Sequence, residues 1–128
     1  EKNGLQFDPR LFATVENVGI FEACARMLPR NPTAMIIAGE GRALALDHVL
    51  YLMNKKVPDD ISVISFEETN VSGFLSPAHT TVDQDLNKIA ATVVELIFRI
   101  ERENPAEPIH ISLDSKIIER DSVKDLTI

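Results

Sequence analysis

Acidic side chains follow two short apolar runs of this 128-residue chain, and they are its first candidates for chemistry. Glu67 and Glu68 follow SVISF, and Glu40 follows TAMIIAG. Apolar runs of this length, rich in β-branched residues, are typical of buried strands. If the two strands are neighbours, Glu40 and Glu67 share one rim, since ligands gather at the carboxyl ends of parallel strands. Carboxylates there can bind sugar hydroxyls or the ring nitrogens of a base.

These carboxylates also have ordinary structural explanations. Glu67 and Glu68 can lie in a solvated loop or cap a following short helix, and we expect a structural role for Glu68. Glu40 can favour the N-terminus of the helix that follows it. The segment GEGRA, residues 39–43, resembles a shortened phosphate loop. Leu44 stands where a dinucleotide fingerprint has its third glycine, and the acidic Glu40 repels phosphate.

Other reactive side chains do not form a recognisable metal or catalytic set. Three histidines and the single cysteine lack the spacing of metal ligands. They are His48, His79, His110 and Cys24. We expect each histidine at the surface or satisfied by hydrogen bonds, and the cysteine in the core. Ser65, Ser72 and Ser76 lack the context of a nucleophile elbow. The sequence therefore predicts no enzyme and no cofactor.

Composition indicates one soluble globular domain, with 45% hydrophobic and 26% charged residues. No apolar run approaches the roughly 20 residues of a membrane span, and the opening EKNGLQFD lacks the apolar stretch of a signal peptide. A single cysteine cannot form an internal disulfide, which favours a reducing cytoplasm. The net charge of −7 indicates that this segment does not itself grip nucleic acid. A DNA-binding segment outside it is compatible with that charge.

Apolar periodicity predicts alternating helices and strands. Helices are predicted over residues 15–28, 42–56 and 86–102, and strands over 33–38, 60–66 and 109–113. A helical turn within 70–77 and a strand at 116–120 are further candidates. Lys55 and Lys56 are expected in the last turn of the second helix, and Asp85 as the N-cap of the third. This order predicts an α/β fold, with a mostly parallel sheet flanked by helices.

Four motifs in register resemble the effector-binding domain of the LacI/GalR family of bacterial transcriptional regulators. They are NPTAMIIAGEGRALALDHVL, KKVPDDISVISFEET, SPAHTTVDQDLNKIAATVVELI and IIERDS. The resemblance implies a type I periplasmic-binding-protein-like lobe, one of two that hold a small molecule between them. It makes residues 1–128 a partial effector-binding domain. Residues 1–84 and 116–128 would belong to the C-terminal lobe and 85–115 to the N-terminal lobe. The helix-turn-helix, the rest of the N-terminal lobe and the first strand of this lobe would lie outside the chain.

The resemblance also carries effector contacts onto this sequence. The matching positions are Glu67, Gln84, Gly39, Glu40 and Thr14. Glu67 would accept bonds from the effector, as the family's acidic residue after the strand does. Gly39 replaces a ligand-binding asparagine, Thr14 replaces an aromatic stacking residue, and Ser65 replaces a glycine. These departures indicate an effector unlike the commonest sugars, or a degenerate site.

The sequence thus predicts the effector-sensing and dimerisation domain of a cytoplasmic bacterial regulator. A sugar- or nucleoside-like metabolite would bind between the lobes and control DNA binding by the helix-turn-helix. The resemblance implies a homodimer, with no membrane partner, through a surface that includes Leu44, His48, Phe74 and Leu75. The alternative prediction is a periplasmic-type solute-binding protein for sugar uptake, with the same fold and no DNA-binding head.

Overall fold

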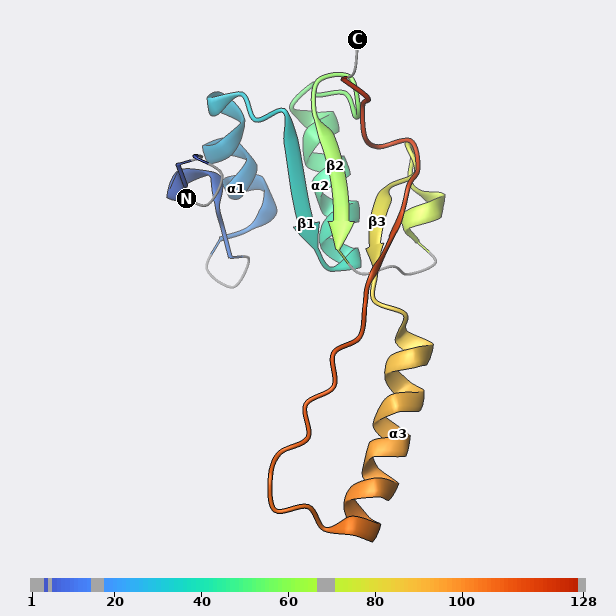
Figure 1. Cartoon of the computed structure of the whole chain (residues 1–128). Helices are drawn as coiled ribbons and strands as arrows, with labels where there is room; N and C mark the ends of the chain where they lie inside the picture. Colours follow the sequence, from blue (N-terminus) through green and yellow to red (C-terminus); the bar gives the residue numbers. More distant parts are fainter. Residues whose placement is uncertain (1–3, 5, 15–17, 67–70, 127–128) are drawn as a thin grey trace.

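The computed structural model describes residues 4, 6–14, 18–66 and 71–126, and it shows a layered lobe from which a helix projects (Figure 1). In chain order the elements are η1 (Pro9–Leu11), α1 (Ile20–Met27), η2 (Leu28–Arg30), β1 (Ala34–Ala38), α2 (Glu40–Leu52), β2 (Ser62–Phe66), η3 (Ser72–Phe74), β3 (Thr80–Asp83), α3 (Leu86–Glu103) and β4 (Lys116–Ile118). The order of helices and strands follows the predicted alternation.

The sheet has the strand order β1-β2-β3-β4. β1 pairs in parallel with β2 and β2 with β3, whereas β4 is antiparallel to β3. Ala38 lies opposite Phe66, and Phe66 lies opposite Val82. The carboxyl ends of the parallel strands are therefore level at one edge, which we call the rim. The mostly parallel α/β fold is confirmed.

The core lies between the sheet and the helices α1 and α2. Its buried members are Cys24, Leu28, Leu46, Val49, Leu50, Ile61 and Val63. Leu46 and Leu50, one helical turn apart, are each 1% exposed, which places one face of α2 against β1 and β2. Cys24 is a core residue, as its apolar stripe predicted. α1 begins at Ile20, after the extended Gly19, and so later than predicted.

The predicted end of α2 was wrong. The helix ends at Leu52, so Lys55 and Lys56 lie beyond its last turn. Asn54 adopts the left-handed conformation (φ 55°), and its N–H donates to the Tyr51 carbonyl at 3.0 Å. The next N–H, of Lys55, donates to the Leu50 carbonyl at 2.9 Å. This pair of bonds is a Schellman motif, and asparagine tolerates its left-handed position better than most residues do.

Two strand predictions also differ from the structure. Thr80–Asp83 forms β3, where the sequence analysis predicted no strand. Residues 109–113, whose alternation predicted a strand, join no ladder. Alternation describes a half-exposed segment, but a strand also needs a neighbour to accept and donate its backbone bonds. The strand predicted at 116–120 is confirmed over Lys116–Ile118, and the helical turn within 70–77 as η3.

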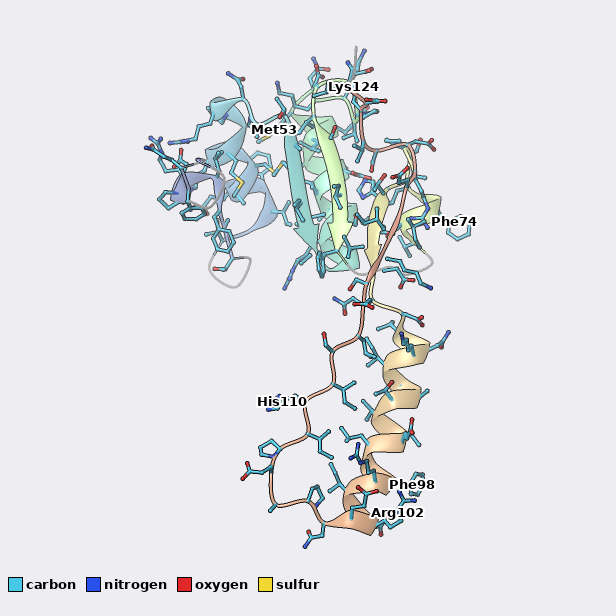
Figure 2. All side chains as sticks on the ribbon, in the orientation of Figure 1. Met53, Phe74, Phe98, Arg102, His110 and Lys124 are labelled. Carbon is cyan, nitrogen blue, oxygen red and sulfur yellow. The ribbon has the colours of Figure 1, made fainter. Side chains whose placement is uncertain are left out.

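The helix α3 and residues 104–115 form an arm that leaves the rim and returns to β4 (Figure 1). Asp85 caps α3, because its side chain accepts a bond from the Lys88 N–H at 3.1 Å, as predicted. Figure 2 shows Phe98 and Arg102 near the far end of the arm and His110 on the returning segment. No residue of α3 is buried. The arm therefore contributes no side chain to the core of the lobe.

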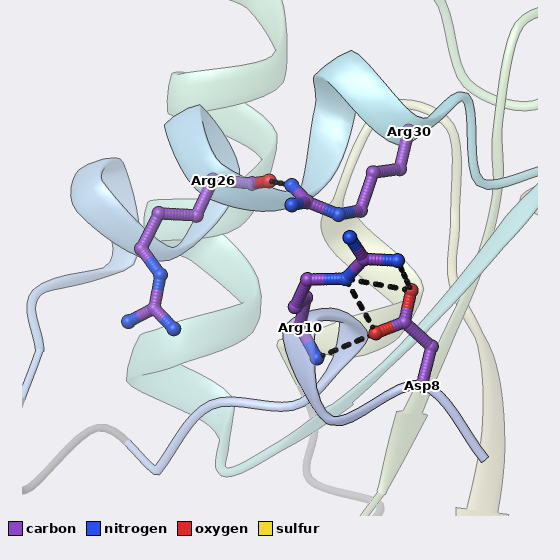
Figure 3. Close-up of polar contacts among 4 residues, drawn as sticks. All are labelled: Asp8, Arg10, Arg26 and Arg30. Atoms are coloured by element: carbon purple, nitrogen blue, oxygen red, sulfur yellow. Dashed lines mark hydrogen bonds and ion pairs between the residues drawn. The ribbon is translucent and has the colours of Figure 1, made fainter.

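Local polar contacts fix the turn that precedes α1 (Figure 3). The Asp8 carboxylate caps η1 by accepting from the Arg10 N–H at 3.0 Å, and it pairs with the Arg10 guanidinium at 2.8 Å. These bonds hold the pKa of the partly exposed Asp8 carboxyl at about 2, below its usual 3.8. The Arg30 guanidinium donates to the Arg26 carbonyl, near the end of α1. The turn leads directly into residues 11–14.

Candidate functional site

A cavity of about 730 Å³ lies between residues 11–14, α1 and β1. This volume falls within the roughly 300–1,000 Å³ of small-molecule sites. Most of its lining is apolar and includes Phe12, Met27 and Ile37. Ile36, on the edge strand β1, is 73% exposed there. Three further lining residues bring polar or aromatic groups: Thr14, Arg42 and Phe66.

The rim joins the two runs that first suggested chemistry. The Gly39 N–H donates to the Phe66 carbonyl at 3.3 Å, so the ends of β1 and β2 touch. β1 and β2 are therefore neighbouring strands, which was the condition for Glu40 and Glu67 to share one rim. Glu67 and Glu68 lie outside the described residues, and of Glu40 the structure describes only the backbone, which opens α2. Glu67 and Glu40 as effector contacts, and the structural role expected for Glu68, stay predictions.

Gly39 has a backbone that favours glycine, with φ 91° and ψ 130°. A Cβ built there would meet the Arg42 side chain at ordinary contact distance, 3.5 Å, so strain rather than space opposes a side chain. The Arg42 guanidinium donates to the Ala38 carbonyl at 3.3 Å and lines the cavity. Sequence reasoning missed Arg42. Its place in the first turn of the helix after the strand end was the available signal.

The remaining predicted effector positions separate into two groups. Gln84 is half-buried directly after β3, at the same rim as Gly39. Parallel strands lie about 4.8 Å apart, so the ends of β1 and β3 are separated by roughly 10 Å. Thr14 lines the cavity, whereas Gly39 and Gln84 do not. The geometry places Gly39 and Gln84 at a common edge and Thr14 in the cavity, and the role of all three as effector contacts stays a prediction.

The positions predicted for dimerisation lie mostly at the surface. Leu44 is 55% exposed and Phe74 86%, His48 is exposed and Leu75 half-buried. Tyr51 and Leu52 extend the exposed stripe on α2 at helical spacing from Leu44 and His48. We call Leu44, His48, Phe74 and Leu75 the association face. Its role in pairing also stays a prediction.

A buried polar network was missed in the sequence. The Ser65 Oγ lies 2.6 Å from His79 Nδ1, and His79 Nε2 lies 2.9 Å from the Asp47 Oδ1. Ser65 is 2% exposed and His79 0%. Neither lines the cavity described above, so no substrate reaches the serine there. The prediction that His79 is a satisfied polar residue is confirmed.

Two classes of feature do not occur in the described part of the chain. Its helices include none that is long and apolar enough to cross a bilayer. Its His, Cys, Asp and Glu side chains gather in no group of three or more that could hold a metal ion.

Comparison with known proteins gives the family. The model of the periplasmic binding protein-like domain matches residues 1–123. The chain is similar to the probable HTH-type transcriptional repressor ExuR of Bacillus subtilis (strain 168), with 29% identity over 84% of this chain and 33% of the relative. It is also similar to a probable opine utilization operon repressor of Rhizobium rhizogenes, with 34% identity over 74% of this chain and 48% of the relative. The chain thus spans a third to a half of these relatives.

The fold agrees with these sequence relatives. The chain superposes on the transcriptional regulator CelR in complex with cellobiose with a TM-score of 0.81, covering 94% of this chain and 38% of that one at 22% identity. At this identity the match shows the fold alone. The chain belongs to the periplasmic binding protein-like domain family, in the form found in the effector-binding domains of LacI/GalR-type regulators.

Proposed function

We propose that this region is the effector-sensing and dimerisation part of a bacterial LacI/GalR-type transcriptional regulator. A small sugar- or nucleoside-like metabolite binds between two lobes and changes their relative position. DNA is bound by a helix-turn-helix outside these residues, and the protein acts in the cytoplasm. The effector must prefer one arrangement of the lobes, because a ligand with equal affinity for both shifts nothing.

One observation carries the proposal: the level rim from which the arm departs. Gly39, Phe66 and Gln84 come from the ends of β1, β2 and β3, and α3 begins just beyond Gln84. Ligands of open α/β sheets bind outside the carboxyl ends of the strands. A metabolite at this rim would touch the sheet on one side and the segment that leads into the arm on the other.

The exposed apolar surface of the arm supports a second lobe. Leu86, Ile97 and Phe98 are 60%, 57% and 65% exposed. A helix with an apolar stripe normally buries that stripe against another element. We assign residues 85–115 to the N-terminal lobe and residues 1–84 and 116–128 to the C-terminal lobe. The free edge of β1 supports a further strand on that side, as the resemblance implied.

The effector contacts that we assign are Glu67, Gln84, Gly39, Glu40 and Thr14. Glu67 would accept hydrogen bonds from effector hydroxyl or N–H groups. The Gly39 position offers backbone only, and the nearby Arg42 adds a cation that the resemblance did not supply. This combination supports an effector that differs from the commonest sugars of the family. No catalytic role is assigned to any of these residues.

The names of the relatives favour regulation over uptake. Both sequence relatives reported above are described as repressors. A solute-binding protein for sugar uptake would share the fold but carry no DNA-binding head. The regulator is therefore the proposal, and self-association through the association face belongs to it.

Thermal unfolding of the polypeptide that carries both lobes tests the proposal. The probes are D-ribose, cellobiose, sugar phosphates, nucleosides and amino acids. A probe at about 100 times its dissociation constant adds roughly 2.7 kcal/mol of stability. We expect one probe class to raise the unfolding temperature and to change operator affinity. Stabilisation without any change in DNA binding would contradict the regulator and favour uptake.

The substitution Glu67→Ala tests whether the effector binds at the rim. We expect the affinity for the active probe to fall by tenfold or more, since a hydrogen bond to a charged group is worth roughly 1.5–3 kcal/mol. Glu119→Ala is the matched control, because Glu119 is an exposed glutamate that follows β4 at the opposite edge of the sheet. Equal affinity in the Glu67→Ala variant and the wild type would remove Glu67 from the site.

A further inference from the structure

The Asp47–His79–Ser65 contacts, which we call the His79 network, connect three elements inside the lobe. Asp47 lies on α2, Ser65 on β2, and His79 on the segment between η3 and β3. The two side-chain bonds are short, 2.6 Å to Ser65 and 2.9 Å to Asp47. The serine and the imidazole are buried, whereas the Asp47 side chain is 19% exposed. The network thus runs from the sheet interior to the outer helix.

For a neutral His79 ring beside an ionised Asp47, chemistry fixes the direction of each hydrogen bond. An ionised carboxylate only accepts, so His79 Nε2 carries a hydrogen and donates it to Asp47. In the neutral imidazole Nδ1 then has a free lone pair, and the Ser65 hydroxyl donates to it. Both ring nitrogens are satisfied without a buried net charge on the ring. Loss of either partner would leave a buried polar atom unpaired, which is unfavourable.

The backbone of His79 extends the same connection to η3. Its N–H donates to the Ser72 carbonyl at 2.9 Å, and its carbonyl accepts from Arg120 Nη1 at 2.7 Å. Ser72 opens η3, the turn that carries Phe74. His79 therefore holds η3 through its main chain, and α2 and β2 through its side chain.

These two elements, α2 and η3, supply the association face. Asp47 lies between Leu44 and His48 in the sequence of α2, one turn from the first and adjacent to the second. Phe74, 86% exposed, projects from η3 (Figure 2). Two separate elements form one usable surface only if their relative position is fixed. The side-chain bonds of His79 to α2 and β2, together with its backbone bond to Ser72, connect the two elements.

We propose that the His79 network holds α2 and η3 in one arrangement on β2, and so positions the association face for pairing with a second copy of this chain. Ser65, Asp47 and His79 are positioning residues, and none touches the partner as a main contact. The inference rests on the proposed function, because it takes the association face from it. It adds the buried residues on which that face depends.

Sedimentation equilibrium of the polypeptide that carries both lobes tests the inference. Ser65→Ala removes the donor to His79 Nδ1 at a fully buried position that cannot reach a partner. We expect the dimer dissociation constant to rise about tenfold, because roughly 1.4 kcal/mol, the scale of one buried hydrogen bond, is a factor of ten. Val63→Ala is the matched control, two residues away on the same buried face of β2, and should leave association unchanged. An equal effect of both changes would overturn the inference.

Two variants of Asp47 test whether the hydrogen bond from His79 Nε2 is needed for association. Asp47→Asn keeps an oxygen that accepts from His79 Nε2 and should retain near-wild-type association. Asp47→Leu leaves that N–H without an acceptor and should weaken association as Ser65→Ala does. Nitrogen-15 spectra of the imidazole should show a hydrogen on Nε2 and none on Nδ1 in the wild type and in Asp47→Asn. A wild-type ring with its hydrogen on Nδ1 would contradict the network.

Phe74→Glu separates this inference from the proposed function. If it abolishes association while Ser65→Ala does not weaken it, the association face is right and the network has no positioning role. If Phe74→Glu leaves association unchanged, or the wild type is monomeric, the association face is wrong and the inference falls with it. Tenfold weakening by Ser65→Ala together with loss of dimer in Phe74→Glu supports both.

Discussion

The lobe and the arm differ in how deeply their apolar residues are buried. In the lobe, Leu46 and Leu50 of α2 are each 1% exposed and meet the buried β2 residue Val63. In the arm, no residue of α3 is buried, and Ile97 and Phe98 are more than half exposed. Both helices are regular and both are rich in apolar side chains. The lobe supplies its own core, whereas the arm leaves its apolar side chains unburied.

The largest expected effect is in the lobe. Ile61→Ala removes a side chain that is 1% exposed and belongs to the core cluster. The free energy of unfolding should fall by about 2–5 kcal/mol, through lost burial and the cavity left behind. Urea unfolding followed by far-ultraviolet circular dichroism measures it. A loss well below this range would mean that the lobe core is less complete than its burial indicates.

Ile97→Ala is the matched change in the arm, where the side chain is 57% exposed. In the 128-residue chain we expect a change within about 0.5 kcal/mol, as for other surface positions. In the polypeptide with both lobes, the same change should cost about 2–5 kcal/mol, because the stripe is then buried. Equal, small effects in both polypeptides would contradict the assignment of residues 85–115 to a second lobe.

The comparison also explains what sequence reasoning could find. Periodicity located α3 and the runs that became β1 and β2, because these are long or strongly apolar segments. The same rule predicted a strand at 109–113, where the returning segment of the arm has no pairing neighbour. It overlooked β3, since TTVD is four residues long and adjoins a helix start. Local pattern reports a side chain's preference for burial, while pairing depends on residues far along the chain.

The candidate site shows the same limit. The resemblance selected Gly39 and Gln84, which the structure brings to one rim. The His79 network joins His79 to residues 14 and 32 positions earlier in the sequence, and no local sequence motif predicts these contacts. The predicted end of α2 failed at Asn54, whose left-handed conformation ends the helix before its two lysines. The network was thus missed because it depends on tertiary placement, and the end of α2 because it depends on the backbone conformation of one residue.

A smaller effect is expected at the junction of lobe and arm. Asp85→Ala removes the side chain that accepts from the Lys88 N–H at the start of α3. Loss of an N-cap costs about 1 kcal/mol, and alanine also tolerates the left-handed conformation (φ 51°) poorly. Amide hydrogen exchange should accelerate over residues 86–89 and remain unchanged in β1. Uniform acceleration across the lobe would show that the arm and the lobe unfold as one unit.

The smallest effects concern ion pairs near the surface, that of Asp8 with Arg10 and those of Glu103 with Arg99 and Arg102. The side chain and the N–H of Arg10 hold the pKa of Asp8 at about 2, below its usual 3.8. On the arm, hydrogen bonds from Arg99 and then Arg102 lower the pKa of Glu103 below its usual 4.5. Both folded-state pKa values are depressed, so each contribution is present above the usual value and is lost as the pH falls through the lowered one. Because the Asp8 carboxyl is partly exposed and the Glu103 carboxyl exposed, the effect on global stability is slight.

Carbon-13 titration of the two carboxyls distinguishes the regions. Arg10→Ala should raise the pKa of Asp8 only part of the way to 3.8, because the backbone N–H at position 10 still donates to it. Replacing both arginines that donate to Glu103, Arg99 and Arg102, should return its pKa to about the ordinary value, since both of its described bonds come from side chains. Added salt should raise both pKa values by screening, and should do so less for Asp8. A complete return of the Asp8 pKa in Arg10→Ala would show that the helix-capping bond in η1 does not persist in solution.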